Sequence, residues 1–119
     1  MRFLTKFLSS AGFALLLAIS THAETITPNE AAYYVGDSAT VAGAVSQVST
    51  SKSGTTFINF GGRYPNQKFY AVLFRKNAGE FAGIHSLEGK TISITGPIEL
   101  YKGKPQIILR SPGQIEILN

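Results

Sequence analysis

The sequence contains no cysteine and no tryptophan, and only 15% of its residues are charged. Without cysteine, neither a disulfide framework nor a thiolate metal site can form. A chain of 119 residues with 44% hydrophobic residues has the composition of one ordinary globular domain, which excludes a disordered or collagen-like protein. The sequence has 11 Lys and Arg but only seven Asp and Glu. This excess of positive charge suits an anionic partner, such as nucleic acid.

Residues 1–23 have the pattern of a secretory signal peptide. Arg2 and Lys6 precede an apolar run over residues 11–19, and Thr21-His22-Ala23 offers small residues for cleavage. This run is too short to cross a hydrocarbon core, which requires roughly 20 apolar residues. We therefore expect an exported protein, periplasmic or extracellular, whose mature form is the single domain 24–119 without membrane attachment; the alternative is an N-terminal helix of the folded domain. Removal of Arg2 and Lys6 leaves nine basic against seven acidic residues, a net charge of +2.

The mature chain predicts a mostly β protein with short helices. Thr27 and Glu30 have the spacing of a capping box around Pro28, which predicts a helix that ends at Gly36. Alternating patterns predict strands over residues 40–48, 55–60, 68–75, 91–101 and 106–110, a helix-like connector over 76–87 and a last extended piece over 114–118. Five strands in so short a chain are expected to close into a small Greek-key barrel, because closure removes free sheet edges.

Two strands carry specific expectations. Gly43, in the middle of the first strand, predicts a bulge or a sharp bend. In the fourth strand, Pro97 predicts a bend on the outward side, and one face is predicted to be buried: Ile92, Ile94, Gly96, Ile98 and Leu100.

Several motifs follow one another along the mature chain: residues 26–36 (ITPNEAAYYVG), 52–61 (KSGTTFINFG), 87–90 (LEGK), 94–96 (ITG), 99–107 (ELYKGKPQI) and 111–115 (SPGQI). Together they resemble the small exported bacterial OB-fold domains that bind nucleic acid. The resemblance implies a five-stranded OB-fold barrel with an N-terminal helix and a short helix between the third and fourth strands. It also implies a ligand on the second and third strands, between the loops that join strands 1–2 and 4–5. OB-folds also bind oligosaccharides and proteins, so a cell-envelope module that binds a glycan or a partner protein is the alternative.

Basic residues are concentrated around this expected binding face. No acid occurs between Ser38 and Gly79, and seven of the nine mature cations lie in this block or in the turn between the last two strands: Lys52, Arg63, Lys68, Arg75, Lys76, Lys102 and Lys104. Segregated charge suits a groove that follows a phosphate backbone. The alternative is that these side chains only keep exposed turns soluble.

Aromatic residues on the second and third strands could form a stacking platform. One register places Phe57, Asn59, Phe69 and Arg75 outward, where bases could stack on the rings. A slip of one residue would instead turn Tyr70, Val72 and Phe74 outward and Phe69 into the core. Tyr64 and Tyr101 lie beside turns and are expected to be exposed. The predicted nucleic-acid-binding residues are Lys52, Phe57, Asn59, Arg63, Tyr64, Lys68, Phe69, Arg75, Tyr101, Lys102 and Lys104.

Catalytic chemistry is not indicated. His85 is the only histidine of the mature chain and has no nucleophile at an identifiable spacing. A metal-dependent nuclease would need clustered carboxylates near the binding strands, and residues 38–79 contain none. We therefore expect no enzyme activity, no metal and no cofactor.

Overall fold

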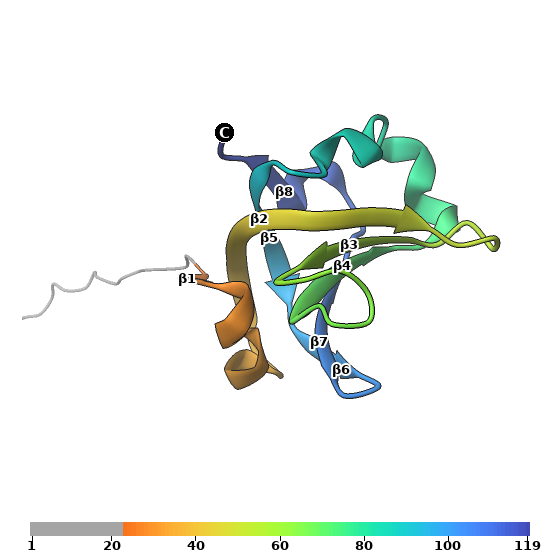
Figure 1. The fold of residues 1–119 in the computed structure, drawn as a ribbon. Coiled ribbons are helices and arrows are strands. Elements are labelled where there is room, and N and C mark those ends of the chain that lie inside the picture. Colours follow the sequence, from red (N-terminus) through yellow and green to blue (C-terminus); the bar gives the residue numbers. More distant parts are fainter. Residues whose placement is uncertain (1–22) are drawn as a thin grey trace, which may run out of the picture.

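The computed structural model describes residues 23–119, so the predicted signal peptide lies outside the described residues except for Ala23 (Figure 1). The prediction of a mostly β protein is confirmed. The five longer strands are β2 (Ser38–Thr50), β3 (Thr56–Phe60), β4 (Phe69–Leu73), β5 (Thr91–Pro97) and β7 (Lys104–Ile108). Three short strands are β1 (Glu24–Ile26), β6 (Glu99–Tyr101) and β8 (Ile115–Ile117).

All helices of the described residues are short 3-10 helices: η3 (Pro28–Tyr34), η4 (Arg75–Glu80), η5 (Ile84–Leu87) and η6 (Pro112–Gln114). The predicted first helix is η3, and its capping box is present, because the Glu30 carboxylate accepts a hydrogen bond from the Thr27 backbone N–H at 2.9 Å. The predicted connector consists of η4 and η5, separated by a turn at Gly83, whose φ of +75° suits glycine. In residues 23–119 no helix has the length and apolar character needed to span a bilayer.

The strands form one sheet in the order β6-β7-β4-β3-β2-β5-β8, and β1 pairs in parallel with β2. Strand β2 is shared between two ladders, because its residues 38–44 pair with β5 and its residues 45–50 pair with β3. The bend predicted at Gly43 lies at this change of partner and is visible in Figure 1 as the sharp curve of β2. The ladder with β3 is irregular between Val45 and Gln47, so Ser46 is an extra, bulged residue.

Near the two ends of the sheet, β5 and β7 approach one another. These strands lie side by side, and a Cβ on Gly96 would come within 2.9 Å of Ile107 Cγ2. No ladder of backbone hydrogen bonds joins them within residues 23–119, so the sheet is open by its hydrogen-bond pattern.

The hydrophobic core lies inside the curved sheet and is completed by residues of η3 and of the connector. Ile92, Ile94 and Ile98 are buried, as the alternation of the fourth strand predicts. The prediction that Leu100 is buried is wrong, because its side chain is 59% exposed. The reason is a break at Ile98, which leaves the strand and exchanges backbone hydrogen bonds with Gly36 and Asp37. The chain beyond it becomes the separate strand β6, whose three residues are all exposed.

Candidate nucleic-acid interface

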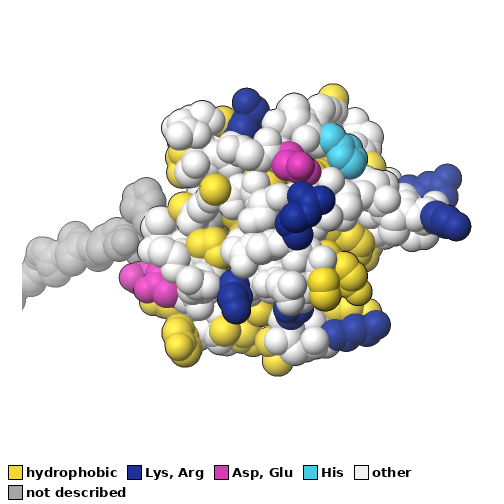
Figure 2. Space-filling model, in the orientation of Figure 1, with side chains coloured by type: hydrophobic (Ala, Val, Ile, Leu, Met, Phe, Trp, Pro, Cys, Tyr) yellow, Lys and Arg dark blue, Asp and Glu magenta, His cyan; other side chains and the backbone are white. Residues whose placement is uncertain are grey.

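An open groove of about 620 Å³ lies over β3 and β4 on the face opposite the core. It is bounded on one side by the turn that joins β2 to β3, and on the other by the turn that joins β6 to β7. Its lining residues are Gln47, Ser49, Thr50, Ser51, Phe57, Asn59, Tyr64, Pro65, Gln67, Tyr70, Tyr101, Lys102 and Lys104. Figure 2 shows basic side chains at the projecting tip of the β2–β3 hairpin and beside the β6–β7 hairpin, with hydrophobic side chains between them.

The pairing of β3 with β4 decides which side chains reach this groove. Asn59 is opposite Tyr70, and Phe60 is opposite Phe69. Phe60 faces the core, so Phe69 is buried with it at a ring-centroid distance of 5.4 Å. The prediction that Phe69 points outward is therefore wrong. Strand β4 pairs with β3 in the alternative register, which is shifted by one residue from the register that would turn Phe69 outward. Tyr70 takes the outward place.

Four aromatic rings line the groove. Phe57 is half-buried and meets Tyr70 edge to face at 5.8 Å between ring centroids. Tyr64 is 73% exposed and Tyr101 is 52% exposed, so the predicted exposure of both is confirmed. Burial, and secondarily the charge of a nearby ionised Tyr101, raises the pKa of Tyr70, so its hydroxyl keeps its proton at neutral pH. The groove thus combines apolar ring faces with phenolic hydroxyl groups.

Two of the predicted basic residues line the groove, Lys102 and Lys104, and none of its lining residues is acidic. The Lys102 ammonium lies 5.4 Å from the centre of the Tyr101 ring. The Lys104 ammonium donates a hydrogen bond to the backbone oxygen of Gln67 at 2.9 Å, which leaves two of its N–H groups for a ligand. Because no carboxylate competes for these cations within the groove, both are available to an anionic ligand.

Three other predicted cations are exposed outside the groove lining: Lys52, Lys68 and Arg75. Lys52 lies in the turn between β2 and β3. Arg75 lies against the same turn, since a Cβ on Gly54 would be 2.9 Å from its Cδ. Lys68 lies at the other end of β3, where a Cβ on Gly61 would be 2.8 Å from its Cγ. Their participation in binding remains a prediction.

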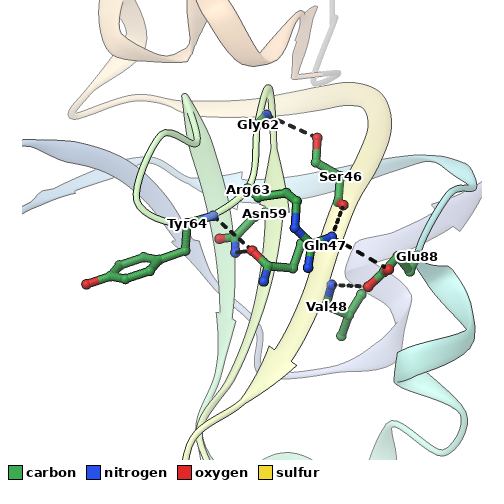
Figure 3. A network of polar contacts seen from close by, with 8 residues as sticks. All are labelled: Ser46, Gln47, Val48, Asn59, Gly62, Arg63, Tyr64 and Glu88. Carbon is green, nitrogen blue, oxygen red and sulfur yellow. Dashed lines mark hydrogen bonds and ion pairs between the residues drawn. The ribbon is translucent and has the colours of Figure 1, made fainter.

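The loop over residues 61–67 is attached to β2 by the bulge. Gln47 Oε1 accepts hydrogen bonds from the backbone N–H of Tyr64 at 2.9 Å and from the Asn59 amide at 3.0 Å. Ser46 Oγ accepts a hydrogen bond from the backbone N–H of Gly62 at 3.0 Å. Figure 3 shows these contacts converging from the loop onto β2. Because the bulge turns two adjacent polar side chains toward the loop, it fixes the place of Tyr64 at the rim of the groove.

Arg63 belongs to this support rather than to the groove. Its guanidinium donates to the Ser46 backbone oxygen at 3.4 Å and lies 3.9 Å from a Glu88 carboxylate oxygen. The other Glu88 oxygen accepts a hydrogen bond from the Val48 backbone N–H at 2.8 Å. Figure 3 shows the Arg63 side chain on the opposite side of the loop from the Tyr64 ring. The predicted binding residue Arg63 therefore does not line the groove.

Several lining residues were missed by sequence reasoning, chiefly Gln47, Ser49, Gln67 and Tyr70. Tyr70 was predicted to point outward only in the alternative register. Gln47 and Ser49 alternate with the buried Val48, which is a signal that the sequence contains. Gln67 lies in a loop, where no periodic pattern could identify it.

Metal-ligating side chains do not cluster in the part of the chain that the structure describes, where no three His, Asp or Glu lie close enough to hold an ion. His85 lies at the surface, with Nε2 2.9 Å from the Thr50 hydroxyl, which in turn contacts the Thr56 hydroxyl at 2.7 Å.

Comparison of the sequence with models of known protein families and with curated proteins found no match. Among solved structures, the fold is similar to part of a protein assigned as an aspartyl-tRNA synthetase from Leishmania major Friedlin, with a TM-score of 0.53 and 8% sequence identity. The similarity covers 92% of this chain and 23% of that chain, so this chain corresponds to less than a quarter of that protein's length. At this level of identity, the likeness concerns the fold alone.

Proposed function

We propose that this chain is an exported, non-catalytic OB-fold protein that binds single-stranded or structured nucleic acid with little sequence preference. The observation that carries the proposal is the groove over β3 and β4, which combines four aromatic rings and two lysines with no acid. Stacking of bases on rings is tolerant of sequence, because every base has an aromatic face. Lysines at the rim can hold the phosphates that connect the stacked bases.

The OB-fold assignment has support from the strand arrangement. The pairing of β2, β3, β4, β5 and β7 fits the order expected of the five OB-fold strands, and β5 lies beside β7 where a barrel would close. In an OB-fold, oligonucleotides and oligosaccharides bind on the second and third strands between the 1–2 and 4–5 loops. The groove occupies this position. A solved structure with a similar fold is assigned as an aspartyl-tRNA synthetase, which agrees with a nucleic-acid ligand.

Export is supported by the composition of residues 1–23. Strand β1 begins at Glu24, directly after the proposed cleavage position, so removal of residues 1–23 leaves every described strand intact. Mass measurement of the secreted form, expected to start at Glu24, checks this part of the proposal.

Salt-dependent titration of a labelled oligonucleotide tests the binding function. If about four phosphates are engaged, the logarithm of the affinity should fall with the logarithm of salt concentration at a slope near −3. Lys102→Ala or Lys104→Ala should reduce the magnitude of this slope by about 0.7 each, because each removes one phosphate contact. Lys90→Ala is the matched control, since Lys90 is exposed and does not line the groove.

The proposal fails if no oligonucleotide binds at low salt, or if binding ignores salt concentration. Displacement of the oligonucleotide by an envelope oligosaccharide would instead favour a glycan-binding module on the same face. Incubation with plasmid and divalent cations is expected to leave the DNA intact, and cleavage by the pure protein would contradict the non-catalytic part.

A further inference from the structure

The groove contains two buried hydrogen-bond acceptors that have no partner. Asn59 is 1% exposed and Gln67 is 5% exposed, and both line the groove. Within residues 23–119, neither Asn59 Oδ1 nor Gln67 Oε1 receives a hydrogen bond. Most buried side-chain polar atoms in proteins are paired, so two unpaired oxygens in one groove call for a specific explanation.

The surrounding contacts hold these two residues in place. The Asn59 amide nitrogen donates to Gln47 Oε1, which also accepts the backbone N–H of Tyr64. Reversal of the Asn59 amide would set its oxygen against the Gln47 oxygen and leave its nitrogen unpaired. The backbone oxygen of Gln67 is bonded to Lys104, which ties this residue to the opposite rim. The interior of the groove therefore offers acceptors, while its lysine donors lie toward the 101–104 turn.

We propose, on the basis of the nucleic-acid-binding function above, that Asn59 Oδ1 and Gln67 Oε1 accept hydrogen bonds from the exocyclic amino group of a base. Cytosine carries a two-donor amino group at the position where uracil and thymine carry a carbonyl acceptor. A carbonyl at this point would face the Asn59 oxygen, which Gln47 holds in this orientation, and would leave both of these acceptors unsatisfied. The groove therefore prefers cytosine over uracil, as a bias added to sequence-tolerant stacking.

Access to the two oxygens requires a groove side chain to move, because both oxygens are covered in the ligand-free protein. The Tyr64 ring, which lines the groove, is one side chain that can make room. It is 73% exposed, and the loop that carries it is held by backbone contacts, so its side chain can change position while the loop stays attached to Gln47. A base that enters the groove would then present its amino edge to the two acceptors.

The test compares the affinities of short oligo-dC and oligo-dU for the full protein at one salt concentration. Cytosine and uracil differ only along the base edge that carries this amino or carbonyl group. We expect oligo-dC to bind about tenfold more tightly, which corresponds to about 1.4 kcal/mol. An oligonucleotide in which 2-pyrimidinone replaces cytosine lacks only the amino group, and it should bind as weakly as oligo-dU. This comparison uses the unaltered protein and does not depend on how a variant folds.

A variant then connects the preference to the groove. Gln67→Met removes Oε1 but keeps the side-chain length and the backbone oxygen bonded to Lys104, so it should lower the affinity for oligo-dC and leave that for oligo-dU unchanged. Asn66→Ala is the control, an exposed amide one residue away that does not line the groove. Equal binding of oligo-dC and oligo-dU, or an equal loss for both in Gln67→Met, would overturn this inference while the proposed function stands. Failure of both to bind would refute the proposed function as well.

Discussion

At the scale of single residues, the core and the proposed binding groove lie on opposite faces of β3. Ile58 and Phe60 point into the core and are fully buried, whereas Phe57 and Asn59 point into the groove. The same division holds on β4, where Phe69 packs on Phe60 and Tyr70 packs on Phe57. Neighbouring aromatic residues of one strand therefore have different roles, and substitutions can separate them.

Phe69→Ala should mainly lower stability, whereas Phe57→Ala should mainly weaken oligonucleotide binding. Phe69→Ala leaves a cavity beside Phe60 and should lower the free energy of unfolding by about 3–5 kcal/mol. Phe57→Ala should cost less stability, because the ring is half-buried, but should weaken oligonucleotide binding by about 1–3 kcal/mol through lost stacking. Urea denaturation and titration of both variants measure this difference. A Phe57→Ala variant with unchanged affinity would remove Phe57 from the binding surface.

Tyr70 gives the protein a pH dependence at alkaline pH. Burial, followed by the effect of Tyr101, raises the pKa of Tyr70 above the ordinary value of 10.0. Below that value, the folded and unfolded chains both keep the phenolic proton, so the free energy of unfolding does not change on this account. As pH rises further, the unfolded chain loses the proton first, and the free energy of unfolding falls.

Tyr70→Phe lacks this proton and should lose less stability than the natural protein as the pH rises above about 10. Urea denaturation across this range compares the two proteins, which differ only in this hydroxyl group. If the free energies of unfolding of the two proteins fall in parallel with pH, Tyr70 does not contribute to the alkaline loss of stability.

At the scale of elements, the curvature of β2 positions residues that line or support the groove. The strand serves one ladder before the bend and another after it, and the bulge that follows presents Ser46 and Gln47 to the loop over residues 61–67. The Pro28 ring of η3 packs against the bend at Gly43, where there is no room for a side chain. The first helix therefore helps to define the shape of a strand that carries groove residues at its far end.

Gly43→Ala should disturb this arrangement. The added Cβ would lie 2.9 Å from Pro28 Cγ and 3.1 Å from Pro28 Cδ, so the helix or the strand must shift. We expect a loss of about 1–3 kcal/mol in the free energy of unfolding. Gly79→Ala is the matched control, because no atom lies within 4 Å of its added Cβ, and it should stay within about 0.5 kcal/mol of the natural protein. Equal stabilities of the two variants would show that the bend tolerates a side chain.

The sequence predicted the elements better than it predicted their faces. The capping box, the bend near Gly43 and the exposure of Tyr64 and Tyr101 follow from local chemistry that a short segment contains. The orientation of Phe69 did not follow, because every residue of β4 is buried and the strand shows no alternation. Its face is fixed only by the register with β3, which depends on the whole sheet.

Long-range partners explain the other differences. Arg63 contacts Glu88, which is remote in the sequence and lies outside the acid-free block over residues 38–79. Leu100 is exposed because Ile98 leaves the strand to bond with Gly36 and Asp37 near the start of the domain. Both outcomes depend on how distant segments meet, which periodicity does not report.

At the scale of the whole molecule, the placement of charge carries more information than its amount. The mature net charge of +2 is small, but the groove contains lysines and aromatic rings without an acid. A second hollow of different character lies over another part of the sheet, at β1, β2, β5 and β8, and is lined by Thr25, Thr40, Ser93, Thr95, Gln114 and Glu116 among others, with no lysine or arginine. The two hollows therefore predict different responses to a polyanion.

Chemical-shift mapping with isotope-labelled protein and a short single-stranded oligonucleotide tests this division most directly. Binding in the groove predicts that the largest amide shifts cluster at residues 47–51, 57–59, 64–70 and 101–104, and that they diminish as salt is added. Amides around Thr40 and Thr95 in the second hollow should hardly move. Shifts centred on the second hollow, or no shifts at all at low salt, would contradict a nucleic-acid interface over β3 and β4.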